Sequence, residues 1–176
     1  VANGFVKTNE GDIVDFKSNA KLTELMNIIG ETEDKCIIWA NYVHNIEGIK
    51  KKLAETYGVD SVVSIYGKDS VDVRNQAVEK FQNKEECRFL VGNPTVGGYG
   101  LTLTAAKYVI YFSNSYNLEV RQQSEDRAHR IGQKNKVTYV DFVCKGTVDE
   151  KILTALKNKV DIASQVMGDE LKSWIS

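Results

Sequence analysis

The fold class of this chain is decided by two short apolar runs, Cys36-Ile37-Ile38-Trp39-Ala40 and Val62-Val63-Ser64-Ile65-Tyr66. Both are rich in β-branched residues and have the length of a buried strand. Between them, residues 46–57 repeat apolar side chains at the helical period, and Gly58 follows as a helix stop. A strand, a helix and a second strand in this order are typical of an α/β domain with a mainly parallel sheet.

The same alternation continues toward both ends of the chain. Residues 21–29 carry apolar side chains at helical spacing, with Ser18 as the expected N-cap and Gly30 after the last turn. Further helices are expected over 73–81, 119–129 and 148–159 and in the tail up to Ile175, and further strands over 88–91, 108–112 and 137–143. The pattern predicts an α/β domain with a mainly parallel sheet.

Residues 1–17 differ from the rest of the chain. The turn-forming run Asn9-Glu10-Gly11-Asp12 separates Phe5-Val6 from Ile13-Val14, which is typical of a hairpin. We therefore expect a hairpin or linker over 1–17 and one domain over 18–176. Because the chain begins at Val1 and not at Met, we also expect it to be a piece of a larger protein.

Composition and charge exclude several classes of protein. Of the 176 residues, 42% are hydrophobic and 27% charged, which suits one apolar core without a disulfide or metal. The chain has no bilayer-spanning run and no secretory leader pattern, so no membrane association is expected. With a net charge of −1, any binding of nucleic acid must come from a local group of basic residues.

The three cysteines, Cys36, Cys87 and Cys144, are far apart and form no Cys-x-x-Cys pair. This favours a reducing compartment, the cytosol. Their apolar neighbours favour burial over a reactive thiol. Since only His44 and His129 could join them as ligands, we expect no metal site.

Glycine and threonine gather in the loop after the strand over 88–91. Residues 93–104 hold glycines at positions 97, 98 and 100 and threonines at 95, 102 and 104. Glycine lets backbone N–H groups approach a phosphate, and threonine hydroxyls add hydrogen bonds. The spacing does not match the dinucleotide fingerprint Gly-x-Gly-x-x-Gly. The loop is therefore either a contact for phosphate or nucleic acid, or an ordinary strand-to-helix turn.

A second signal lies in the expected helix over 119–129. If the helix continues, Gln123, Arg127 and Arg130 fall at i, i+4 and i+7, on one face. Two converging guanidinium groups are unfavourable without an anion, and a guanidinium fits phosphate oxygens well. The alternative is a solvated helix in which Glu125 and Asp126 pair with the arginines. Spacing alone leaves both interpretations open.

Taken together, these segments resemble the C-terminal RecA-like lobe of superfamily-two helicases, especially the Swi/Snf-type translocases of double-stranded DNA. The run Asp126-Arg127-Ala128-His129-Arg130-Ile131-Gly132-Gln133, with Gln123 before it, resembles motif VI. Residues 97–106 resemble motif V, and residues 36–42 are similar to motif IV. Gly146-Thr147-Val148-Asp149-Glu150 resembles the Gly-Thr-x-Glu-Glu brace that closes the lobe.

The resemblance implies a three-layer αβα fold related to the P-loop NTPases, and a role for individual residues. Arg127 and Arg130 would be arginine fingers for the γ-phosphate of ATP, supported by Gln123. The residues implied near the nucleotide are Gly98, Gly100 and Asp126, and those implied near DNA are Gly67, Lys68, Ser70, Thr102, Thr104 and Tyr116.

ATP and Mg²⁺ are the implied cofactors, and both would be held mainly by an N-terminal RecA-like lobe of the same protein. That lobe and double-stranded DNA are the implied partners. The chain itself has no Gly-x-x-x-x-Gly-Lys-Ser/Thr, and Gly67-Lys68-Asp69-Ser70 lacks the upstream glycine of a P-loop. We therefore expect the chain alone neither to bind ATP tightly nor to hydrolyse it.

The chain departs from the family pattern at two places. Tyr116-Asn117-Leu118 stands where many relatives have Trp-Asn-Pro, so the aromatic residue and the Asn remain but the Pro is lost. Thr102 replaces an Asn that is common in the chromatin remodellers. The second departure favours bacterial, phage or annealing-helicase-like relatives. The resemblance therefore implies the cytoplasm of a bacterial or phage-infected cell, or the nucleus if the source is eukaryotic.

Three functions stay open at this point. The first is a motor lobe that couples ATP hydrolysis to movement along duplex DNA. The second is a non-catalytic module that binds protein or nucleic acid; the intact Gln123, Arg127 and Arg130 argue against it. The third is an RNA-directed helicase lobe, and the ending Arg130-Ile131-Gly132-Gln133 points away from it.

Overall fold

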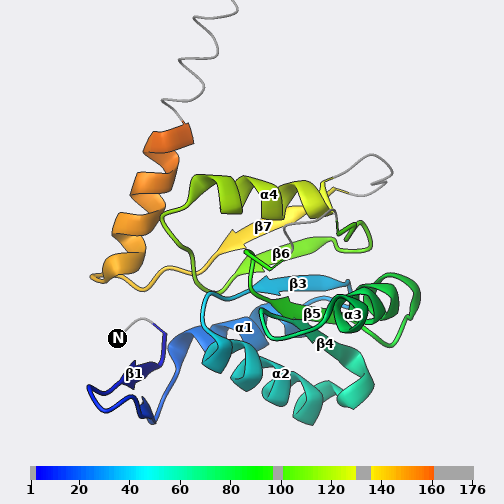
Figure 1. Ribbon diagram of the computed structural model, residues 1–176, viewed down its shortest axis with the longest axis horizontal. Helices are drawn as coiled ribbons and strands as arrows, with labels where there is room; N and C mark the ends of the chain where they lie inside the picture. The colour runs from blue at the N-terminus through cyan, green and yellow to red at the C-terminus, as the bar shows by residue number, and fades with distance from the viewer. Residues whose placement is uncertain (1–2, 97–100, 130–135, 161–176) are drawn as a thin grey trace, which may run out of the picture.

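Five parallel strands form the centre of the protein (Figure 1). The computed structural model describes residues 3–96, 101–129 and 136–160. The strand order is β4-β5-β3-β6-β7, and every neighbouring pair is parallel. The bounds are Cys36–Trp39 for β3, Val62–Ile65 for β4, Phe89–Gly92 for β5, Tyr108–Tyr111 for β6 and Thr138–Asp141 for β7. The predicted α/β fold is confirmed.

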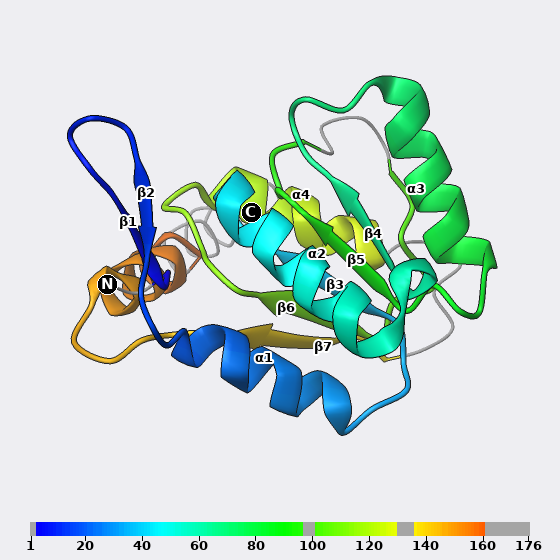
Figure 2. The ribbon, with the colours of Figure 1, turned by 90° about the horizontal axis from the view of Figure 1, so that it is seen from below.

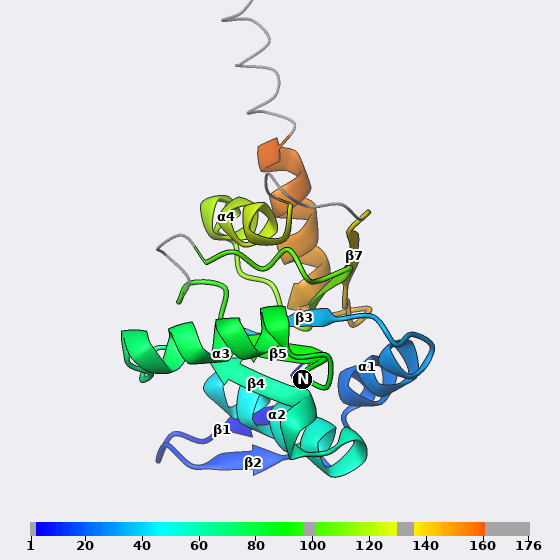
Figure 3. The same ribbon diagram turned by 90° about the vertical axis from the view of Figure 1, so that its right-hand side faces the viewer.

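Helices cover both faces of this sheet, as α2 and α4 on opposite sides of β3 show in Figures 1 and 3. Side chains alternate along a strand, so Ile38 packs with α1 (Ala20–Gly30) and α2 (Val43–Tyr57) in one apolar cluster. Ile37 belongs to a second cluster, with α3 (Val71–Asn83) and α4 (Leu118–Ala128). The result is a three-layer αβα domain.

The helix ends follow side-chain and glycine chemistry, with one correction. Asn19, and not the predicted Ser18, caps α1, because its Oδ1 accepts the N–H of Leu22 at 3.1 Å. Gly58 ends α2 as predicted and adopts a φ of 96°, which disfavours any other residue. A short 3₁₀ helix, η1 (Val59–Ser61), then leads into β4.

Burial of two cysteines is confirmed. Cys36 and Cys87 are fully buried, whereas Cys144 is partly exposed. Burial raises the pKa of the Cys36 thiol to about 12, which keeps this thiol protonated and unreactive at neutral pH.

The brace-like run that follows β7 fastens the last described helix, residues 148–160, to the domain. Asp149 forms a buried ion pair with Lys21 at 2.7 Å and also accepts the N–H of Cys144 at 3.1 Å. The Lys21 ammonium donates a further hydrogen bond to the carbonyl of Phe112. These contacts join α1, the loop after β6 and the final helix, which explains how the Gly146–Glu150 run closes the lobe.

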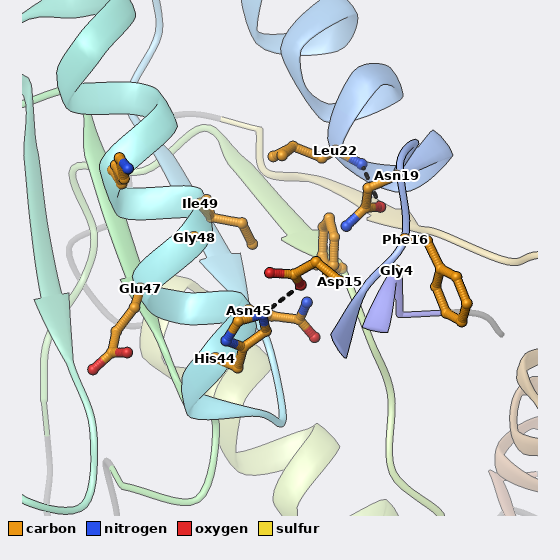
Figure 4. A pocket seen from close by; sticks show the side chains of 12 residues that line it. Gly4, Asp15, Phe16, Asn19, Leu22, His44, Asn45, Glu47, Gly48 and Ile49 are labelled. Atoms are coloured by element: carbon orange, nitrogen blue, oxygen red, sulfur yellow. Dashed lines mark hydrogen bonds and ion pairs between the residues drawn. The ribbon is translucent and has the colours of Figure 1, made fainter. Parts of the chain in front are cut away.

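The first strands, β1 (Phe5–Lys7) and β2 (Ile13–Asp15), form an antiparallel hairpin outside the sheet (Figure 2). Its Asp15 carboxylate lies 2.6 Å from His44 Nε2 on α2. Between the hairpin and the first turns of α1 and α2 lies a pocket that Asp15, Asn19 and Gly48 help to line (Figure 4). The hairpin is therefore docked against α2.

Candidate functional site

The loops that follow the strands meet at the carboxyl edge of the sheet. After β3 the chain enters α2 on one face, and after the adjacent β6 it enters α4 on the other face. Such a change of direction between neighbouring parallel strands creates a crevice in which α/β proteins bind ligands. The candidate site is therefore sought at the ends of β3 and β6.

Polar side chains tie these loops together. The Nδ2 of Asn93, after β5, donates to the carbonyl of Asn41, after β3, at 3.0 Å. The N–H of Asn41 donates in turn to Oγ of Ser113, after β6, at 2.9 Å. Asn93 also donates its own N–H to the carbonyl of Ile65 at the end of β4. The edge is thus a connected frame and not a set of independent loops.

The departure at Tyr116-Asn117-Leu118 has a simple structural consequence. Asn117 is the N-cap of α4, and its Oδ1 accepts the N–H of Val120 at 3.2 Å. Leu118 occupies the first helical position, where a Pro is favoured because its missing N–H needs no partner there. Tyr116 keeps an exposed ring, so its predicted contact role is sterically open.

The predicted stripe on α4 is not a single surface. Gln123 and Asp126 are exposed, and Gln123 donates to Glu119 at 3.0 Å. Arg127 is buried, with 5% of its surface exposed. The helix ends at Ala128, before the position of Arg130, and Arg130 lies outside the described residues.

The loop before β6 contacts the end of α4 beside Arg127. Its N–H at Leu103 donates to the carbonyl of Arg127 at 2.9 Å, which brings residues 101–106 against the end of α4. The guanidinium carbon of Arg127 lies 5.5 Å from the centre of the Trp39 ring. Within the described chain, neither Nη1 of Arg127 nor Nε1 of Trp39 has a hydrogen-bond partner. Burial lowers the pKa of Arg127, and the nearby Tyr111 opposes this only in part.

The loop between β4 and α3 presents the predicted Gly67 and Lys68 to solvent. Asp69 holds the turn, since its Oδ2 accepts the N–H of Tyr66 at 2.7 Å. A side chain at Gly67 would meet no atom within 4 Å, so the fold leaves open space beside this backbone. Ser70 is the N-cap of α3, and its hydroxyl oxygen accepts the N–H of Val73. The loop therefore offers an accessible backbone and one exposed ammonium.

The two threonines that were predicted to contact DNA differ. Thr102 is exposed. Thr104 is partly buried, and its hydroxyl accepts a hydrogen bond from Gln82 on α3 at 3.2 Å. Gly98 and Gly100 lie outside the described residues. Thr104 thus has a structural task in joining the loop to α3.

No metal centre appears in residues 3–96, 101–129 and 136–160, where no three His, Cys, Asp or Glu side chains are grouped for a metal ion. In the same ranges, every helix is too short or too polar to cross a bilayer.

The comparisons with known proteins decide the family. Residues 20–132 match the model of the helicase conserved C-terminal domain. The chain belongs to this family. It is 36% identical to the putative ATP-dependent helicase/translocase YwqA of Bacillus subtilis over 156 residues, or 89% of this chain and 16% of that protein. It is 36% identical to the human chromatin-remodeling ATPase INO80 over 63% of this chain and 7% of that protein.

Solved structures agree with the sequence relatives. The Sulfolobus solfataricus SWI2/SNF2 ATPase core in complex with double-stranded DNA matches 76% of this helicase C-terminal domain and 28% of that chain, with a TM-score of 0.64 and 32% identity. The C-terminal part of the Fun30 ATPase domain matches 79% of this domain and 46% of that chain, with a TM-score of 0.69 and 26% identity.

The predicted resemblance to the RecA-like C-terminal lobe of Swi/Snf-type helicases is therefore confirmed. The chain is a C-terminal helicase domain of the SWI2/SNF2 type. It spans only 16% of the length of YwqA, so it corresponds to one part of such a protein.

One arginine of this helicase C-terminal domain was missed at the sequence level. Arg121 stacks on Tyr111, with its guanidinium carbon 3.4 Å from the ring centre. It forms ion pairs with Asp141 and with Glu125, both at 2.5 Å, and Asn114 accepts a further hydrogen bond. Only the i, i+4 spacing to Glu125 could have indicated this, because Asp141 comes from a different strand.

Proposed function

We propose that this chain is the C-terminal motor lobe of an ATP-dependent translocase on double-stranded DNA. In this proposal it supplies Arg127 and Arg130 to ATP that is bound on an N-terminal RecA-like lobe of the same protein. The observation that carries the proposal is the Arg127 guanidinium at the end of α4, which is buried beside the carboxyl edge of the sheet and whose Nη1 has no hydrogen-bond partner among the described residues. A donor in that state lacks an acceptor, and a phosphate oxygen is a suitable one.

The nucleotide part of the proposal rests on this donor and on relatives described as ATP-dependent. ATP with Mg²⁺ would be held mainly by the second lobe, and the nucleotide supplies a γ-phosphate whose transfer to water develops negative charge on its oxygens. Arg127 and Arg130 would stabilise that charge. Gln123 and Asp126, which are exposed on α4, would line this domain's side of the cleft between the two lobes, together with Gly98 and Gly100.

The DNA part of the proposal rests on the exposed loops at the same edge of the sheet and on the likeness to a SWI2/SNF2 core solved with double-stranded DNA. Gly67 and Lys68 are the best placed, because a phosphate can approach the open backbone at Gly67 while the ammonium adds charge. The other candidates are Ser70, Thr102, Thr104 and Tyr116. Ser70 and Thr104 already serve α3, so we expect them to act mainly by holding the loops in place.

The test is the ATPase activity of the full protein, measured with no nucleic acid, with duplex DNA and with RNA. We expect activity that duplex DNA stimulates and RNA does not, and none from residues 1–176 alone. Arg130→Ala should lower turnover by at least about 10²-fold with ATP affinity within a few-fold of the parent, because the finger acts in the transition state. Lys50→Ala, an exposed lysine on α2, is the control.

Unchanged turnover in Arg130→Ala would contradict the arginine-finger assignment. A full protein that binds DNA but hydrolyses no ATP with any nucleic acid would favour the binding module, and stimulation by RNA alone would favour the RNA-directed helicase.

A further inference from the structure

Arg127 is buried inside the domain, whereas an arginine finger must contact a phosphate that is bound on another lobe. Its side chain is 5% exposed, its Nη1 is buried, and residues 101–106 pack over the end of α4. From this position the guanidinium cannot touch a phosphate on another lobe. If Arg127 acts on ATP, it must first leave the contact that holds it inside the domain.

That contact is with Trp39, the last residue of β3. The indole is fully buried, and the Arg127 guanidinium lies over it at 5.5 Å from the ring centre. Gly92, the register partner of Trp39 on β5, leaves room for Ile65 first and for the indole second: a Cβ there would come within 2.6 Å of Ile65 Cγ1 and 3.2 Å of Trp39 Cζ3. Trp39 shares its apolar cluster with Ala128, the last residue of α4, so the indole lies where α4 ends.

The contact between Arg127 and Trp39 is only moderately favourable, because it leaves hydrogen-bond donors without acceptors. A cation over an aromatic face is stabilised, and more so away from water. Two N–H groups at this contact, Nη1 of Arg127 and Nε1 of Trp39, nevertheless lack an acceptor within the described chain. An unpaired buried donor disfavours the state that contains it. The resting position is therefore stable enough to be occupied and weak enough to be given up when an acceptor is offered.

We propose that Trp39 is a positioning residue that retains Arg127 in the resting position, and that release of Arg127 from Trp39 accompanies closure onto the nucleotide-bearing lobe. This rests on the proposed function. Removal of the aromatic face should then favour the released state before DNA is bound, and so raise the basal ATPase rate. A purely structural role would do the opposite, since a damaged core lowers activity.

The test compares Trp39→Leu, Trp39→Phe and Phe81→Leu in the full protein. Phe81 is a matched control because it is fully buried in the same apolar cluster, and its ring faces Lys35 and not Arg127. The measurement is kcat for ATP without and with duplex DNA, together with Tm. We expect Trp39→Leu to raise the DNA-free rate about three- to tenfold and to reduce DNA stimulation by the same factor, with Trp39→Phe in between.

Phe81→Leu should lower Tm without raising the DNA-free rate. If Trp39→Leu fails to fold, Trp39→Phe alone decides, since it retains most of the volume with a weaker cation–π contact. A DNA-free rate that stays level or falls in the Trp39 variants, as in Phe81→Leu, would overturn the proposal. Arg127→Ala distinguishes failure of the proposed function from failure of the Trp39 proposal. If Arg127→Ala leaves turnover unchanged, the arginine-finger assignment is wrong. If it greatly lowers turnover while the Trp39 variants leave the DNA-free rate unchanged, only the role of Trp39 is wrong.

Discussion

Two arginines on α4, Arg121 and Arg127, meet two aromatic residues at neighbouring strand ends with opposite results. Arg121 stacks on Tyr111 at the end of β6 and is surrounded by Asp141, Glu125 and Asn114. Arg127 lies over Trp39 at the end of β3 and has no carboxylate partner among the described residues.

The pKa values of the two arginines also shift in opposite directions. Burial by itself lowers the pKa of both arginines. At Arg121 the bonds to Asp141 and Glu125 outweigh burial, so its pKa is raised, whereas at Arg127 burial prevails. Removing one partner of a buried ion pair is costly because the other charge is left uncompensated, whereas a buried cation without partners is retained at a loss of stability. The comparison therefore favours a structural role for Arg121 and supports the contact with phosphate that we propose for Arg127.

The largest effect on folding is expected from Arg121→Met. The substitution removes the cation and leaves Asp141 and Glu125 without it, while Met retains much of the length of the side chain. Breaking a largely buried ion pair by removing one partner should lower the free energy of unfolding by about 3 kcal/mol. Urea denaturation followed by circular dichroism measures this. A loss no larger than that of an exposed lysine variant would show that the cluster contributes little.

The matched change, Arg127→Met, should behave differently. It removes a buried donor that has no partner among the described residues, together with a cation–π contact, so the two effects offset and the free energy of unfolding should change by no more than about 1 kcal/mol. The same denaturation experiment measures it, and ATPase turnover of the full protein should collapse in parallel. Equal destabilisation by both arginine variants would remove the distinction between them.

The smallest effect is expected from Glu125→Gln, which tests how much each of the two ion pairs of Arg121 contributes to stability. Glu125 is 35% exposed and Asp141 23%, and only Asp141 binds two nitrogens of the guanidinium. The more exposed pair is better screened by water, so we expect a loss of about 0.5 kcal/mol. Asp141→Asn is the internal comparison and should cost more. The reverse order would place the main ion pair within α4.

Much of the fold followed from local patterns. The five strands of the sheet and four of its helices lie where apolar runs and helical periods placed them, because each pattern reports which side chains a single element buries. The exception at the start of α1 is instructive. Both Ser18 and Asn19 are good N-caps, and only the backbone path into the helix selected Asn19.

Less of the candidate site than of the fold could be predicted from the sequence. The motifs identified the right segments of the chain. They did not show that Gln123 and Arg127, four residues apart, differ in burial, because this depends on the loop over 101–106 that packs on the end of α4. The Arg121 cluster could not be foreseen, since Asp141 reaches it from β7. Contacts between distant segments leave no periodicity in the sequence.

By itself, the sequence determined the αβα class, the strand and helix segments, and the family to which the domain belongs. The tertiary structure alone decided which arginine has carboxylate partners and which has none among the described residues, and it placed Arg127 over the Trp39 ring. The physical reason is that hydrophobic patterning acts within one element, whereas the partners of a buried charge are supplied by whichever elements the sheet order brings together.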